Sequence, residues 1–230
     1  MWKRNELKEQ GKVALKRNYW KSVLVTAVFT ALIGGGACGA GYSAANSEYV
    51  QNMTSGNVPG GVVAAVVLAA LIIIIAVIAL VILTNVLIVN PLLVGINRFK
   101  INAVKDKGNV SDLGHGFDCA YKRNIKTLFF MDLYLILWSC LFIIPGIVKS
   151  YEYRMIPYIL ADNPDIDRKE AFALSKAMMK GNKWRVFVLD LSFILWYLLG
   201  SITFGIVNVF YVEPYKQLTD AALYNALKTE

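Results

Sequence analysis

The sequence predicts an all-α fold, a polytopic membrane bundle of six transmembrane helices built from three helical-hairpin repeats. Of its 230 residues, 57% are hydrophobic and 17% are charged, whereas about 25% of the residues of a soluble domain are charged. Residues 61–83 contain no polar side chain. A helix of this length is about 35 Å long, which is enough to cross a hydrocarbon core of about 30 Å. The third observation behind the prediction is an internal repeat.

The repeat is clearest between residues 132–138 and 190–196, where five of seven residues are identical at an offset of 58. A fainter copy lies near the N-terminus, where residues 14–18 resemble residues 120–124. Internal repeats define the architecture of a chain, because each copy is one supersecondary unit. The pattern predicts one membrane domain over the whole chain, with hairpin units at about 14–97, 117–163 and 172–225.

Two of the three hairpins are predicted to be closed by very short connections. The dipeptides Pro145-Gly146 and Phe204-Gly205 stand between long apolar segments and leave almost no room for a loop. The first hairpin differs, because a polar loop at 42–60 joins its two helices. The six predicted transmembrane helices cover residues 22–41, 61–92, 126–144, 146–162, 184–202 and 204–222.

The basic residues alternate along the chain. Of the 24 Lys and Arg, seven precede Ser22, seven lie within 98–126, six lie within 168–185 and none lies within 41–60. Cytoplasmic loops of membrane proteins carry an excess of basic residues. Both termini are therefore predicted in the cytoplasm and the 42–60 loop outside. A net charge of +8 can also indicate a nucleic-acid partner, but this alternation argues against one.

One basic segment has the pattern of an amphipathic helix. Asp167 is a suitable first cap and Gly181 a suitable end. We interpret the segment as a helix that lies on the inner leaflet with its apolar side down and attracts anionic lipids. The alternative is a cytoplasmic helix that packs on its neighbours. At 100° per residue, one side of the helix within about 60° carries a set of lysines that we call the basic face, Lys169, Lys176, Lys180 and Lys183.

Six of the ionisable residues inside the predicted transmembrane helices form a candidate polar cluster. Such groups are costly in a bilayer, so they normally face the bundle interior and form pairs. Four acids against two bases leave a surplus of acid, which predicts raised carboxyl pKa values, a bound cation or water. One reading is a proton or cation relay, and the other is structural pairing of Arg154 with Asp132 or Asp190. The set comprises Asp132, Asp190, Arg154, Glu213, Glu152 and Lys149.

Two prolines fall near this charged level, Pro157 and Pro214. Each removes a helix hydrogen bond and exposes a carbonyl group, so each is predicted to break its helix. Transporters use broken helices in this way, although proline is also common in transmembrane helices without such a role.

Four tryptophans fall at two levels of the predicted helices. Trp20 and Trp184 are predicted to anchor their helices at the membrane interface, where tryptophan is enriched. Trp138 and Trp196 lie deeper and are predicted to pack within the bundle.

Nothing in the sequence indicates an enzyme. The three cysteines and the single histidine show no metal-ligand spacing. Phosphate-binding glycine loops and nucleophile triads are also missing from the sequence. We therefore predict no catalytic residues, no metal and no cofactor.

Several motifs of the second half occur together and in order, and their combination resembles a known family. The resemblance is to the bacterial membrane family catalogued as domain of unknown function 975, which is distantly similar to the membrane domain of glycerophosphodiester phosphodiesterases. It implies a multi-pass protein of the bacterial cytoplasmic membrane and transfers no catalytic residue. The motifs are Pro145-Gly146-Ile147, Tyr151 and Tyr153, the segment 157–164, Met179, the segment 181–184, Asp190-Leu191-Ser192-Phe193, Trp196 and Pro214-Tyr215.

The expected function is that of a non-enzymatic membrane protein. Its basic face and bundle interior would contact membrane lipids of the anionic inner leaflet, amphipathic peptides or partner membrane proteins. The alternative is a small proton- or cation-coupled transporter or channel that uses the intramembrane acidic cluster.

Overall fold

The computed structural model describes the chain except for residues 1, 35–59, 119–120, 204 and 230, so the 42–60 loop lies almost wholly outside the described residues. The regular structure of the described residues is helical throughout, as the sequence predicts. Three helices are long and apolar enough to cross a membrane, Ala64–Val104, Tyr121–Leu141 and Lys183–Ile202. The sequence predicts six spans, three more than the described residues show.

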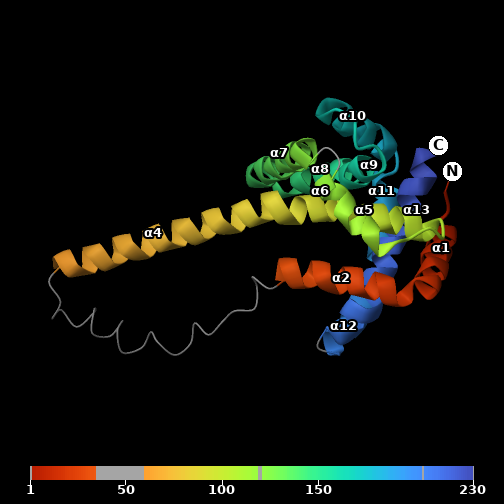
Figure 1. Cartoon of the computed structure of the whole chain (residues 1–230), viewed down its shortest axis with the longest axis horizontal. Coiled ribbons are helices and arrows are strands. Elements are labelled where there is room, and N and C mark those ends of the chain that lie inside the picture. The colour runs from red at the N-terminus through yellow and green to blue at the C-terminus, as the bar shows by residue number, and fades with distance from the viewer. Residues whose placement is uncertain (1, 35–59, 119–120, 204, 230) are drawn as a thin grey trace.

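One long helix connects two very different environments. Helix α4 (Gly60–Thr84) continues through a short π-helical segment, η1 (Asn85–Val89), into α5 (Asn90–Val104). Helix α4 projects from the body of the molecule in Figure 1, whereas α5 enters it. Along α4 the described side chains are exposed, and along α5 most are buried.

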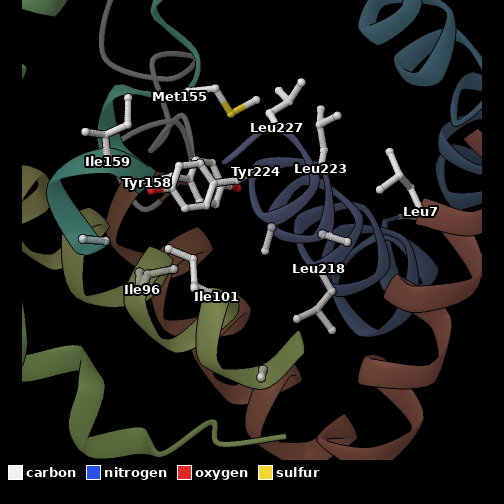
Figure 2. Close-up of a cluster of buried hydrophobic side chains, with 14 of the residues drawn as sticks. Leu7, Ile96, Ile101, Met155, Tyr158, Ile159, Leu218, Leu223, Tyr224 and Leu227 are labelled. Atoms are coloured by element: carbon white, nitrogen blue, oxygen red, sulfur yellow. The ribbon is translucent and has the colours of Figure 1, made fainter. Parts of the chain in front are cut away.

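The packed core lies where four helices meet. Helices α1 (Arg4–Arg17), α9 (Ile156–Asp162) and α13 (Glu213–Lys228) each contact α5, and α1 also packs on α13. Figure 2 shows their apolar side chains converging, with the ring of Tyr158 stacked on that of Tyr224. This core resembles the interior of a soluble helical domain more than a lipid-facing bundle. Its side chains include Leu7, Ile96, Ile101, Met155, Ile159, Leu218, Leu223 and Leu227.

The second hairpin closes three residues earlier than predicted. Helix α7 (Tyr121–Leu141) packs on α8 (Ile143–Tyr153), and the chain reverses at Phe142, which has an extended backbone. Pro145 and Gly146 lie in the first turn of α8. A Cβ on Gly146 would lie 2.7 Å from the Oγ of Ser139 in α7. The glycine therefore allows the two helices to approach closely, rather than forming the turn.

The predicted single helix over 146–162 is wrong. Helix α8 ends at Tyr153, and α9 begins at Ile156 with Pro157 in its first turn. The 11 residues of α8 are about 16 Å long, which is too short to cross a hydrocarbon core unaided. All of α9 from Ile156 to Ala161 is buried in the core. Proline favours a new helix start here, because it needs no hydrogen-bond acceptor in a first turn.

The third hairpin is assembled from shorter pieces. Helix α11 (Lys183–Leu191) is followed by α12 (Ile194–Ile202), then by the π-helical segment η3 (Asn208–Val212) and α13. The turn at Gly205, with φ of +83°, lies where the sequence places it. The predicted helix over 204–222 is exposed only near Ile206 and Phe210. Beyond these residues it belongs to the core, since α13 buries nine of its side chains.

The two π-helical segments have related sequences. Segment η1 and the two residues after it read Asn-Val-Leu-Ile-Val-Asn-Pro, and η3 and the two residues after it read Asn-Val-Phe-Tyr-Val-Glu-Pro. Each segment is followed by a helix with proline in its first turn. This likeness between the first and third units agrees with the predicted repeat, although superposition of whole hairpins stays a prediction. The remaining helices are α2 (Tyr19–Gly34), η2 (Val110–Gly114), α6 (His115–Asp118) and α10 (Arg168–Met179).

Candidate functional site

A largely buried group of charged residues, named the buried charge cluster below, forms at the break between α8 and α9, where the side chains of Arg154, Asp190 and Asp220 are 17%, 23% and 13% exposed. Arg154 lies at the break and directs its guanidinium group toward α11 and α13. Its Nη1 and Nη2 donate to the two carboxylate oxygens of Asp190, at 2.5 and 3.0 Å. Its Nη2 also donates to Asp220 at 2.8 Å. The fork of an arginine suits such a two-point contact, and this pairing with Asp190 is one of those predicted for Arg154.

Two further residues complete the buried charge cluster. The Nζ of Lys216 lies 3.4 Å from Asp190 and 3.4 Å from Asp220. The hydroxyl of Tyr151 donates to Asp190 at 3.0 Å. Each carboxylate therefore contacts two cations. We use the name for Arg154, Asp190, Asp220, Lys216 and Tyr151.

The cluster continues toward α5 and α12. The hydroxyl of Tyr197 donates to Glu213 at 3.0 Å, and the amide of Gln217 donates to the same carboxylate at 3.4 Å. Lys100 on α5 is 6% exposed and interacts electrostatically with Asp220 and Glu213. Three cations thus face three carboxylates in the extended cluster. The predicted acidic surplus is not found here, because two of the cations, Lys100 and Lys216, lie outside the set that the sequence singled out.

Glu152 forms a separate group of ion pairs with two lysines. Its carboxylate oxygens lie 2.6 Å from the Nζ of Lys149 and 2.7 Å from that of Lys183. Its backbone carbonyl accepts a hydrogen bond from the hydroxyl of Ser175 at 2.6 Å. Glu152 therefore joins α8 to both α10 and α11, and it does not belong to the buried charge cluster.

Asp132 does not join the cluster either. Asp132 and Asp190 occupy equivalent positions in the sequence repeat. The side chain of Asp132, however, is exposed on α7 and faces Asn90. The two aspartates thus have the same place in the sequence repeat and different partners. The residues that sequence reasoning missed are Asp220, Lys216 and Lys100. The spacing of Glu213, Lys216 and Asp220 along one face of α13 is the signal that would have found two of them.

The two prolines predicted to break helices both lie at helix starts. Pro157 and Pro214 both lie in the first turn of a new helix, α9 and α13. The break before Pro157 is what brings Arg154 out of the helix and toward Asp190. Before Pro214 the chain remains helical in the π-helical form. This proline therefore follows a distorted stretch of helix, whereas Pro157 follows an interruption between two helices.

Helix α10 packs on its neighbours, and the predicted placement with its apolar side on the membrane is wrong. Ala171, Ser175 and Met179 are each 0% exposed, since α10 contacts α7, α8 and α9. Asp167 caps the helix by accepting from the amide of Lys169, and Gly181 ends it with φ of +79°. The lysines of the basic face at 169, 176 and 180 are exposed, whereas Lys183 turns toward Glu152.

The four tryptophans separate into two groups by exposure, and their levels in the membrane stay a prediction. Trp20 and Trp184, near the starts of α2 and α11, are 75% and 72% exposed. Trp138 and Trp196 are each 38% exposed. Both of the latter have ring partners, since Lys149 lies 5.4 Å from the ring centre of Trp138 and Tyr211 lies 5.5 Å from that of Trp196.

Two of the depressions that Trp184 lines also share Lys183. The first, which we call the lysine pocket, has a volume of about 490 Å³ and is lined by Glu152, Lys176, Lys180, Gly181, Lys183 and Trp184. The second, which we call the apolar groove, has a volume of about 320 Å³ and is lined by Ile147, Val148, Tyr151, Lys183, Trp184 and Phe187. Both lie at the beginning of the candidate span Lys183–Ile202.

The chemistry available to these sites is binding and pairing of charges. Within the described ranges, no group of three or more His, Cys, Asp and Glu side chains is placed to hold a metal ion. The carboxylates of the buried charge cluster face arginine and lysine, which neutralise them without an added cation.

Comparison with known proteins identifies the class at the level of a family. The family described as Protein of unknown function (DUF975) matches residues 133–230, the part of the chain that includes the buried charge cluster and both depressions. This part of the chain is therefore similar to that family, in agreement with the resemblance found from its motifs. No curated protein and no solved structure matches the chain.

Proposed function

We propose that the chain is an integral protein of the bacterial cytoplasmic membrane, built from three related hairpins with both termini in the cytoplasm. The exposed apolar surface of α4 supports a lipid environment, because soluble proteins rarely expose an apolar patch larger than a few hundred Å². In a cysteine-free background, a cysteine in the 42–60 loop should react with an impermeant thiol reagent in intact cells. A cysteine at position 228 should not react, and reaction there would contradict the topology.

We further propose that the protein is non-enzymatic and binds anionic phospholipids of the inner leaflet. One observation carries this proposal: the exposed Trp184 and the lysines of the lysine pocket lie together at the beginning of a candidate span. Tryptophan is enriched at the interface, and basic residues next to a span attract anionic lipids at about 1 kcal/mol each. Peptides and partner membrane proteins are the other ligands compatible with this surface.

The lipids that copurify with the protein test this function. Lipids extracted from the detergent-purified protein should contain anionic phospholipid above its share in the source membrane. Phospholipids incubated with the protein should be recovered chemically unchanged. A bound fraction that matches the source membrane would contradict lipid binding, and conversion of a phospholipid would contradict the non-enzymatic assignment.

The transporter alternative receives less support. A relay needs ionisable groups that exchange protons or cations, and the pairing of Asp190 with Arg154 and Lys216 opposes such exchange. Structural pairing of helix ends accounts for the same residues, because α8, α11 and α13 each contribute one side to the buried charge cluster.

A further inference from the structure

We propose that the lysine pocket and the apolar groove form one site for a single anionic phospholipid, with the phosphate in the pocket and an acyl chain in the groove. This inference rests on the proposed function, since it gives lipid binding a defined place and stoichiometry. It concerns six residues that line the two depressions, namely Ile147, Val148, Lys176, Lys180, Trp184 and Phe187.

The two depressions are parts of one continuous surface. Lys183 and Trp184 line both of them, so a ligand passes from one to the other without leaving these side chains. Trp184 stacks on Phe187, with ring centres 5.3 Å apart, and the two rings form one wall of the apolar groove. Ile147 and Val148 on α8 form the facing wall and are 50% and 44% exposed.

The charge of the lysine pocket selects an anion. Three lysines and one carboxylate line it, and that carboxylate, Glu152, already has Lys149 and Lys183 as partners at 2.6 and 2.7 Å. Lys176 and Lys180 are exposed on α10 and face the same depression. Helix α11 begins at Lys183, and the positive end of its dipole adds to the attraction for a phosphate at this edge.

The order of the two depressions along α8 and α11 matches the order of a phospholipid. Going from Trp184 to Phe187, and from Tyr151 back to Ile147, the groove leaves the lysines and runs along exposed apolar residues. A soluble anion would use only the pocket, and a neutral lipid would use only the groove. An anionic phospholipid satisfies both, because it joins a phosphate to an acyl chain.

Native mass spectrometry of the full-length protein in detergent tests the site. With phosphatidylglycerol added, one lipid should remain bound at activation energies that remove phosphatidylcholine. Removing the charge of one lysine should weaken retention about fivefold, so the double variant Lys176→Gln/Lys180→Gln should lose most of it. Trp184→Ala should weaken retention about threefold through the lost apolar contact.

Matched variants separate the site from general effects of charge and of interfacial tryptophan. Lys169→Gln removes an exposed lysine of the same helix that does not line the pocket. Trp20→Ala removes an equally exposed tryptophan from α2. Both should bind the lipid as the unaltered protein does, and melting temperatures of all variants check that each is folded.

The remaining outcomes distinguish a wrong location of the lipid site from a wrong proposal of lipid binding. If phosphatidylglycerol binds preferentially but Lys176→Gln/Lys180→Gln and Trp184→Ala retain it fully, the site is wrong and the proposed function stands. If phosphatidylglycerol shows no preference over phosphatidylcholine, both are wrong. If glycerol phosphate alone displaces the lipid at equal concentration, the acyl chain has no part in binding and the groove is not part of the site.

Discussion

Helices α4 and α5 are two parts of one continuous helix, and they differ in almost every physical respect. The described side chains of α4 are exposed on all sides, and its residues are apolar except for Thr84 at its end. Helix α5 carries Asn97, Arg98 and Lys100 among its apolar residues and is buried in the core. Figure 1 shows the change of environment as the helix enters the body of the molecule.

The comparison shows how one helix can be suited to lipid along one part and to a protein core along the other. In α4 the backbone is satisfied within the helix, so an apolar surface all round is compatible with lipid. In α5 the polar groups find partners: Arg98 donates to the carbonyl of Ala161 at 2.8 Å, and Lys100 donates to Asn97 at 3.3 Å. The residues of α5 are therefore determined by their contacts with other helices. The residues of α4 are determined only by the apolar environment around them.

The largest expected effect concerns the charges that join the packed core to a candidate span. Arg154→Met leaves Asp190 and Asp220 with Lys216 as their shared cation, and a buried charge without a sufficient partner costs about 4 kcal/mol. We expect a large fall in the melting temperature of the detergent-purified protein. The double variant Arg154→Met/Asp220→Asn should recover part of the loss, because it restores the charge balance.

Loss of transport or binding activity with an unchanged melting temperature would contradict this structural role for Arg154. A double variant as unstable as the single one would show that the contact with Asp190 alone matters. Lys149→Met is the matched control, since it removes a cation of the separate Glu152 pair on the same helix.

A smaller effect tests the comparison between α4 and α5 directly. Ile96 is 0% exposed in α5 and Ile74 is 51% exposed in α4. Ile96→Ala should lower the free energy of unfolding by about 3 kcal/mol, as for other core truncations. Ile74→Ala should change it by less than about 0.5 kcal/mol, and denaturant unfolding in detergent measures both.

Equal losses from the two substitutions would contradict the comparison. They would mean that α4 packs on another protein surface, such as a second copy of the chain, in the purified state. Size-exclusion chromatography with light scattering then distinguishes a monomer from an oligomer.

The sequence predicts the helical class and the Arg154–Asp190 pair correctly, because the class depends on a periodic pattern and a charge within an apolar helix needs a partner. It predicts one span across the break before Pro157, because composition does not reveal whether an apolar helix faces lipid or protein. Helix α13 illustrates the same difficulty. Its apolar residues have the spacing of a span, but its partners are α1, α5 and η3.

The buried charge cluster was only partly predictable for a related reason. The contacts of Asp220 and Lys216 with Arg154 and Asp190 join residues that are far apart in the sequence, so no local pattern indicates them. The repeat also suggested equal roles for Asp132 and Asp190. Their partners differ because α13 lies beside Asp190, whereas Asp132 faces Asn90.

The smallest expected effect concerns Tyr224 in the packed core. Its hydroxyl donates to Asp162 at 2.9 Å, and Lys228 is the other partner of that carboxylate. Burial and the neighbouring charge of Asp162 raise the pKa of Tyr224 above its ordinary value near 10. The raised pKa means that Tyr224 stabilises the fold fully below about pH 10, and that this contribution is lost as the pH rises further, because the unfolded chain releases the proton first.

Tyr224→Phe should therefore cost about 1 kcal/mol of the free energy of unfolding at pH 8, where the hydrogen bond is intact. The difference between this variant and the unaltered protein should shrink as the pH is raised above about 10. Denaturant unfolding between pH 8 and pH 11 measures it. A difference that stays constant over this range would mean that Tyr224 contributes through its ring stacking on Tyr158 alone, and a difference that grows with pH would contradict the raised pKa.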